Sequence, residues 1–144
     1  MRNIIFICHG NICRSVAAEY IAKDMDKEHR FNIISRATSL EEIGNDIYPP
    51  MKRELNRQSI PFSYHQATRI TQKDYDWADV IYYMDDNNLY YLNRLLVDTG
   101  NKFKPVFMYT SGIDEIEDPW YTGNFTKVVN QLKQCIKDIF NNIK

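Results

Sequence analysis

The sequence predicts an α/β domain in which a parallel sheet lies between two layers of helices. Runs of β-branched and aromatic residues alternate along the chain with segments whose apolar residues recur every three or four positions, and this alternation is typical of strands joined by crossover helices. The clearest strand covers residues 3–8, whose continuous apolar run favours burial on both faces. The clearest helix begins near Phe125 and keeps its apolar spacing to Ile143.

The remaining elements follow in order along the chain. Strands are expected at residues 3–8, 31–35, 80–84 and 104–108, and helices at residues 15–27, 50–57, 71–77, 86–96 and 125–143. Asp86 is expected to cap the helix that carries Leu89, Leu92 and Leu96. Pro105 cannot donate a ladder hydrogen bond, so the fourth strand should lie at a sheet edge.

Composition limits the function classes. The 144 residues suffice for one domain with a single core, spanning residues 1–144, and show no repeat or linker. A net charge of −1 gives no case for nucleic acid or an anionic membrane as the main partner. The three cysteines and three histidines lack ligand spacing, so we expect no metal site.

One stretch combines a nucleophile with an anion site. It joins the first strand to the first helix and reads Cys8-His9-Gly10-Asn11-Ile12-Cys13-Arg14-Ser15. A turn of this kind aims backbone N–H groups inward at a helix N-terminus, which favours an anion. A helix N-terminus and a guanidinium both favour the thiolate form, so we expect Cys8 to react as a thiolate. The planar fork of Arg14 matches two phosphate oxygens. The alternative is a buried structural cysteine beside a surface arginine.

Three residues of this stretch suit the turn itself. Gly10 permits close backbone approach, and Asn11 tolerates positive φ. Ser15 is expected to cap the helix and to offer its hydroxyl to the sulfur of Cys8.

A reactive thiol and an odd number of cysteines favour a reducing compartment, and we therefore expect the protein in the cytoplasm.

Residues 8–15 resemble the phosphate loop of the low-molecular-weight protein tyrosine phosphatases. Residues 117–121 (Glu-Asp-Pro-Trp-Tyr) resemble that family's general-acid loop, and residues 35–44, 65–67 and 84–88 also fit, so the resemblance covers essentially the whole chain. It implies a flavodoxin-like sheet in the order 2-1-3-4. It also implies hydrolysis of phosphotyrosine monoesters through a thiophosphate on Cys8, without a cofactor, with phosphate held by the loop side chain Arg14 and by the backbone of residues 9–15 (His9, Gly10, Asn11, Ile12, Cys13, Arg14 and Ser15).

Asp118 is, by this resemblance, the acid that protonates the leaving oxygen and then the base that deprotonates water. From spacing alone it could be a turn aspartate before proline, and three neighbouring carboxylates compete for the role: Asp114, Glu115 and Glu117. The substrate cleft is expected to be formed by Ile12, Leu40, Glu41, Trp120 and Tyr121. Glu41 would repel acidic peptides.

The resemblance also implies supporting roles. Ser35 would hydrogen-bond with Asn11 and Ser15, although an ordinary strand serine is an equal alternative. Glu19 and His65 match a family pair that helps to set the cleft, with a solvated loop histidine as the alternative for His65. Asp85 would anchor the loop, or it caps a helix.

Two further features concern the cysteines. Cys8 and Cys13 would form a reversible disulfide that protects the nucleophile, and the alternative for Cys13 is a small buried packing residue. Cys135 falls on the apolar face of the last helix and is expected in the core.

Three other functions are alternatives for these residues. An arsenate reductase of this fold needs further cysteines after the third strand, and residues 82–96 hold none. A protein arginine phosphatase carries threonine where this chain has Ile12. Because isoleucine offers no hydroxyl and packs against an aromatic leaving group, this position favours phosphotyrosine. A silent phosphate-binding module would lack Cys8, Arg14 or Asp118. The expected partners are phosphotyrosine-containing proteins and inorganic phosphate or other oxyanions, with no nucleic acid and no membrane, and the expected state is a monomer or weak dimer.

Overall fold

A computed structural model describes residues 2–143 of the chain as a parallel sheet covered by helices on both faces. The strands are β1 (Arg2–Cys8), β2 (Phe31–Ala37), β3 (Val80–Tyr83) and β4 (Phe103–Pro105). The helices are α1 (Arg14–Met25), α2 (Pro49–Arg57), α3 (Gln72–Trp77), α4 (Asp86–Leu95), α5 (Pro119–Thr122) and α6 (Phe125–Asn142). The four strands are parallel and lie in the order β2-β1-β3-β4, which confirms the predicted fold class and strand order.

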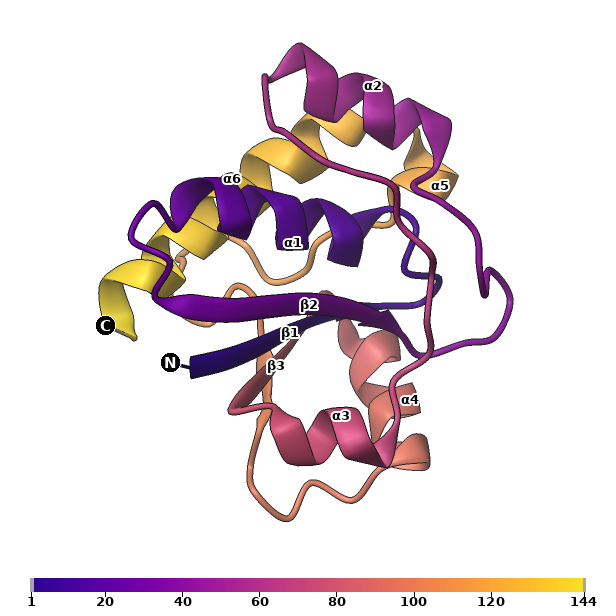
Figure 1. Ribbon diagram of the computed structural model, residues 1–144, viewed down its shortest axis with the longest axis vertical. Helices are drawn as coiled ribbons and strands as arrows, with labels where there is room; N and C mark the ends of the chain where they lie inside the picture. Colours follow the sequence, from indigo (N-terminus) through magenta and orange to yellow (C-terminus); the bar gives the residue numbers. More distant parts are fainter. Residues whose placement is uncertain (1, 144) are drawn as a thin grey trace.

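The alternation of side chains along β1 divides the core into two layers. Ile4 and Phe6 pack into a cluster that includes apolar residues of α1 and α6, whereas Ile5 and Ile7 pack against α3 and α4. All four side chains are fully buried, as a central parallel strand requires. Figure 1 shows α1 and α6 on one face of the sheet and α3 and α4 on the other.

Some predicted boundaries were wrong by a few residues. Asp85, not Asp86, caps α4, because Asp85 Oδ1 accepts from the backbone N–H of Asn88 at 2.8 Å. The last strand ends at Pro105 instead of continuing to residue 108, since the chain turns at once after the proline. Its place at the sheet edge is confirmed. The helix α5 was not predicted, because four residues carry no periodicity.

The start of α1 also differs from the prediction. The helix begins at Arg14, and Cys13 occupies the capping position without a side-chain capping bond. Ser15 therefore lies inside the first turn and does not cap the helix. This leaves its hydroxyl free for the contact with the sulfur of Cys8 described below.

The sheet order positions the loop after β1. From β1 the chain crosses to β2 on one side and later to β3 on the other, and the loops at such a switch point diverge and leave a crevice at the carboxyl ends of the strands. In Figure 1 the loops after β1 and β2 and the short helix α5 gather at this end of the sheet. Among residues 2–143, no helix has the length and apolar character needed to cross a membrane.

Candidate functional site

The loop between β1 and α1 wraps around the sulfur of Cys8. Asn11 lies in the left-handed region, with φ of 60°, and this turns its backbone N–H toward Sγ of Cys8 at 3.3 Å. The Ser15 hydroxyl oxygen lies 3.1 Å from the same sulfur. Both groups can donate to a thiolate, and backbone N–H groups at a helix N-terminus also favour a bound anion. The loop is therefore built to hold negative charge at and above Cys8.

The side chain of Asn11 ties this loop to β2. Its amide Nδ2 donates to Ser15 Oγ at 2.8 Å and to Ser35 Oγ at 2.9 Å. Because the Ser15 oxygen accepts this bond, its own hydrogen can point to the sulfur of Cys8. The Ser35 hydroxyl donates in turn to Glu19 Oε1 at 2.6 Å. Ser35 thus contacts Asn11 directly and reaches Ser15 only through it.

The segment before α3 contacts the loop from outside. His65 Nε2 donates to the carbonyl oxygen of Asn11 at 2.6 Å, and the backbone N–H of Thr68 donates to Asn11 Oδ1 at 3.2 Å. His65 therefore contacts the loop and is not merely a solvated histidine. Glu19 accepts hydrogen bonds from Ser35 and from Lys23, at 2.6 Å each. Glu19 and His65, which were expected to act as a pair, therefore support the loop at separate points: Glu19 through Ser35, and His65 by direct contact with Asn11.

The side chain of Arg14 lies buried between the carboxyl groups of Asp85 and Asp118. Its Nη1 donates to Asp85 Oδ2 at 2.6 Å and to the carbonyl oxygen of Ile116 at 2.9 Å, and its Nη2 lies 3.6 Å from Asp118 Oδ2. Burial alone would lower the Arg14 pKa, but the neighbouring Cys8, Asp85 and Asp118 raise it above its ordinary value. The guanidinium is therefore a fixed positive charge with its orientation set by Asp85.

Asp118 stands where the chain enters α5. Its Oδ1 accepts from the backbone N–H of Trp120 at 3.0 Å, so the carboxyl group caps the short helix, while Oδ2 faces the guanidinium of Arg14. The side chain is about one quarter exposed. A carboxyl group that is anchored through one oxygen and open to the cleft through the other can exchange a proton with a ligand.

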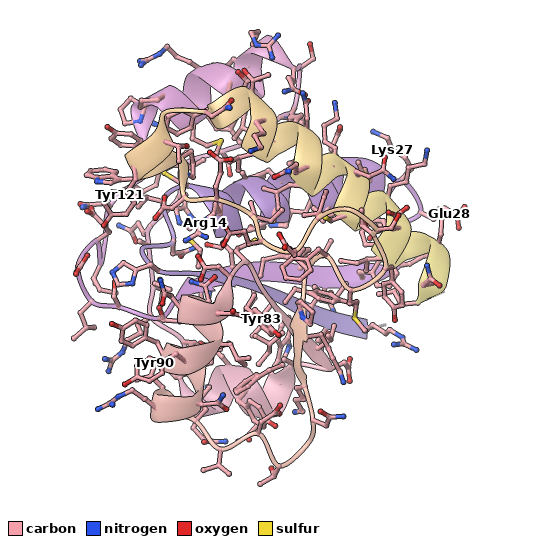
Figure 2. All side chains as sticks on the ribbon, turned by 180° about the vertical axis from the view of Figure 1, so that it is seen from behind. Arg14, Lys27, Glu28, Tyr83, Tyr90 and Tyr121 are labelled. Atoms are coloured by element: carbon pink, nitrogen blue, oxygen red, sulfur yellow. The ribbon has the colours of Figure 1, made fainter. Side chains whose placement is uncertain are left out.

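Cys8, Arg14 and Asp118 all line one cavity of about 110 Å³. Its walls comprise Cys8, His9, Gly10, Ile12, Cys13, Arg14, Glu41, Glu42, Asp118, Trp120 and Tyr121. Figure 2 shows Arg14 and Tyr121 toward one end of the molecule, with Lys27 and Glu28 at the other. Leu40, expected in the cleft, is absent from these walls and has an exposed side chain, whereas Glu42, which was not predicted, lines the cavity and lies beside Gly10.

The other two cysteines differ from Cys8 in their surroundings. Cys13 lines the cavity, and burial, reinforced by the neighbouring Cys8, raises the pKa of its thiol. Cys135 is fully buried in the core, as predicted, and burial raises its pKa as well. Both therefore remain protonated thiols. The residues between positions 2 and 143 include no group of histidine, cysteine and acidic side chains that could hold a metal ion.

Three contacts of the site were not predicted from the sequence. The Ile116 carbonyl, the Thr68 backbone N–H and the Glu42 side chain reach the site through tertiary packing alone. Two of them are backbone groups, whose partners depend on the path of the chain and not on residue type. Glu42 could have been found from its position beside Glu41.

Comparisons with known proteins agree with this geometry. The family model described as low molecular weight phosphotyrosine protein phosphatase matches residues 3–144. The protein of that name from Homo sapiens is 34% identical over 147 residues, covering 94% of this chain and 90% of that protein. The crystal structure of YfkJ from Bacillus subtilis matches with a TM-score of 0.93 and 29% identity, covering 99% of this chain and 94% of that one.

A third comparison concerns the fold alone. The YwlE arginine phosphatase from Geobacillus stearothermophilus matches with a TM-score of 0.88 but only 19% identity, over 99% of this chain and 93% of that one. Since this fold is shared with an enzyme named for a different substrate, the fold alone does not identify the substrate.

Proposed function

Because the chain belongs to the low molecular weight phosphotyrosine protein phosphatase family, we propose that it hydrolyses phosphotyrosine monoesters in proteins. One observation carries the proposal: Arg14 joins the loop around Cys8 to Asp118 within a single cavity. The nucleophile, the cation and the acid are thereby held around the space that a phosphoryl group would occupy.

The first step transfers the phosphoryl group to Cys8. The thiolate sulfur attacks phosphorus, the bond from phosphorus to the tyrosine oxygen breaks, and Asp118 gives its proton to that oxygen. The charge on the equatorial oxygens is stabilised by the guanidinium of Arg14 and by the backbone N–H groups of the loop. Asp85 keeps the guanidinium in the orientation that this contact needs.

The second step returns the enzyme to its starting state. Asp118, now a carboxylate, takes a proton from water, and the water oxygen attacks phosphorus while the sulfur–phosphorus bond breaks. The products are inorganic phosphate and the thiolate of Cys8. The Ser15 hydroxyl, 3.1 Å from the sulfur, can donate to this thiolate as it leaves, which makes the sulfur a better leaving group.

Tyrosine as the carrier of the phosphate is supported by the cavity walls. Ile12 offers an apolar side chain, and Trp120 and Tyr121 offer exposed aromatic rings beside Asp118. An aromatic leaving group gains contact area and ring packing from such walls. A phosphorylated guanidinium group has no aromatic ring to pack against these walls, and the side chain of Ile12 offers it no hydrogen-bond acceptor.

The proposal is tested by measuring phosphate release from a phosphotyrosine peptide and a phosphoarginine peptide with the same flanking residues. We expect turnover of phosphotyrosine that falls more than about a thousandfold in Cys8→Ser, whereas Cys135→Ala keeps its activity. Turnover of phosphoarginine alone would retain the mechanism and replace the substrate. No turnover of either would leave a module that only binds phosphate.

We also propose that the protein works as a monomer or weak dimer in the cytoplasm. The support for the compartment is chemical, since Cys8, Cys13 and Cys135 are all free thiols and a nucleophilic thiol persists in a reducing compartment. Light scattering across a concentration series tests the assembly state, and fractionation of the source cells tests the compartment.

A further inference from the structure

Two adjacent carboxylates lie at the rim of the cavity. Glu41 and Glu42 both line it together with Cys8 and Arg14. The Glu41 side chain is 70% exposed, and its Oε2 lies 3.0 Å from His9 Nε2. Glu42 packs against the phosphate loop so closely that a Cβ added at Gly10 would lie 3.3 Å from its Cγ, and its Oε2 accepts from Asn45 Nδ2 at 2.7 Å. Both carboxylates are therefore held beside the loop.

The charges around the cavity are unbalanced. Its walls contain one arginine, Arg14, which already faces Asp85 and Asp118. The walls contain no lysine, and among the described residues the imidazole of His9 is the only basic group within 4.0 Å of the carboxylate oxygens of Glu41 or Glu42. The loop itself is occupied by the phosphate during the reaction. A peptide residue next to the phosphotyrosine therefore meets two carboxylates that no lysine or arginine of the cavity neutralises.

The placement of these carboxylates decides which peptides they select. Glu41 and Glu42 belong to the segment after β2, whereas Trp120 and Tyr121 belong to α5 and the residue before it is Asp118. In the proposed complex the aromatic ring of the phosphotyrosine packs against α5 and Ile12. Glu41 and Glu42 therefore remain available for the peptide residues next to the phosphotyrosine. A negatively charged peptide residue beside these carboxylates is repelled and a positively charged one is attracted, and solvent reduces both effects.

We propose that Glu41 and Glu42 form a subsite for an arginine or lysine next to the phosphotyrosine, so that the preferred substrates are phosphotyrosine proteins with a basic flank. The inference rests on the proposed function and specifies the charge of the residues that flank the phosphotyrosine. Exposed charge contacts change affinity by up to about fivefold each. Two such contacts, attractive for arginine and repulsive for aspartate, separate the two kinds of peptide by roughly tenfold or more.

The test uses three phosphotyrosine peptides that differ only in the residues beside the phosphotyrosine, which are arginine, alanine or aspartate. The value of kcat/KM is measured for the native protein, for the double variant Glu41→Gln with Glu42→Gln, and for Glu28→Gln. Glu28 is exposed and lies at the opposite end of the molecule (Figure 2), so it controls for a change in net charge alone. Binding of the same peptides to Cys8→Ser is measured by calorimetry.

We expect the native protein to favour the arginine peptide over the aspartate peptide about tenfold, the double variant about twofold, and Glu28→Gln to match the native protein. Higher salt should reduce the preference, because exposed charges are screened. Equal rates for all three peptides would overturn the subsite while leaving the phosphatase intact. Absence of turnover would overturn the proposed function instead, and the ranking of the three peptides in the binding experiment would then decide the subsite separately.

Discussion

Asp85 and Arg14 are joined at 2.6 Å although they lie 71 positions apart in the chain. The carboxylate belongs to the turn between β3 and α4 and the guanidinium to the first residue of α1, and they meet because β1 and β3 are neighbours in the sheet. The same carboxylate uses its other oxygen to cap α4. One side chain thus fixes both the anion-binding arginine and the helix that follows β3.

Replacing Asp85 with asparagine separates these two roles. Asparagine caps a helix as well as aspartate does, so Asp85→Asn removes the charge opposite Arg14 and retains the cap. We expect a loss of about 2 kcal/mol in the free energy of unfolding, because a buried guanidinium loses a partner, and a fall of at least about tenfold in kcat/KM. The adjacent and exposed Asp86, changed to asparagine, is the matched control. Wild-type activity in Asp85→Asn would refute the orienting role.

Replacing Asp118 with asparagine tests the proton donor. The amide oxygen can still accept from Trp120, so α5 keeps its cap. We expect kcat for phosphotyrosine to fall by about a hundredfold or more. An aryl phosphate whose phenol is more acidic needs less protonation of its leaving oxygen, so its kcat should fall much less. Equal losses on both substrates would point to damaged binding, and the exposed Asp114→Asn serves as the control.

Removing the hydroxyl of Ser35 breaks the link between the phosphate loop and β2. Ser35→Ala leaves Asn11 Nδ2 and Glu19 Oε1 each without one of their hydrogen bonds. We expect about 1 to 2 kcal/mol of lost stability and a several-fold rise in KM, because the loop must then be ordered by the substrate. Chemical denaturation and steady-state kinetics measure these effects. Ser111→Ala, at an exposed site, should change neither.

The pH dependence of stability should reveal Glu54. Hydrogen bonds from Arg57, together with those from Gln58 and Thr126, lower the Glu54 pKa from 4.5 to about 2. A carboxylate whose pKa is lower in the folded state stabilises the fold above pH 4.5, and this contribution is lost as the pH falls toward 2.

Comparison of Glu54→Gln with the native protein isolates this contribution. We expect the variant to be about 1 to 2 kcal/mol less stable at pH 7, a value reduced by the exposure of Arg57, and the difference to shrink between pH 4.5 and pH 3. Urea denaturation at several pH values measures it. A difference independent of pH would mean that packing, not charge, is responsible. Glu115→Gln, at an exposed position, controls for net charge.

Oxidation should distinguish Cys13 from Cys135. Peroxide converts the Cys8 thiolate to a sulfenic acid, and the thiol of Cys13 can then displace water from it to form a disulfide. We expect activity lost to peroxide to return with dithiothreitol in the native protein and in Cys135→Ala, but only in part in Cys13→Ser. Full recovery in Cys13→Ser would remove Cys13 from this role. Mass spectrometry of the oxidised protein identifies the disulfide or the sulfinic acid.

The fold class and the loop could be predicted because their signals are local. The apolar run before Cys8 and the apolar spacing along residues 125–143 show directly which positions are buried, because each position's residue type reflects its burial. The turn chemistry of Gly10 and Asn11 depends only on backbone freedom, and Asn11 does adopt positive φ. Boundaries were less certain, as Asp85 and Pro105 show, because a cap or a strand end is decided by one hydrogen bond among several candidates.

The sequence by itself determined the parallel α/β domain through its apolar periodicity, and it indicated the loop around Cys8 through residue type and position. The choice of Asp118 among its neighbouring carboxylates came from the family resemblance. Only the tertiary structure decided how these residues meet: Arg14 between Asp85 and Asp118, Asn11 between Ser15 and Ser35, and Glu42 in place of Leu40 at the cavity wall. The physical reason is that such contacts join side chains from separate strands and loops. Their distances follow from strand order and helix packing, which no local stretch of sequence contains.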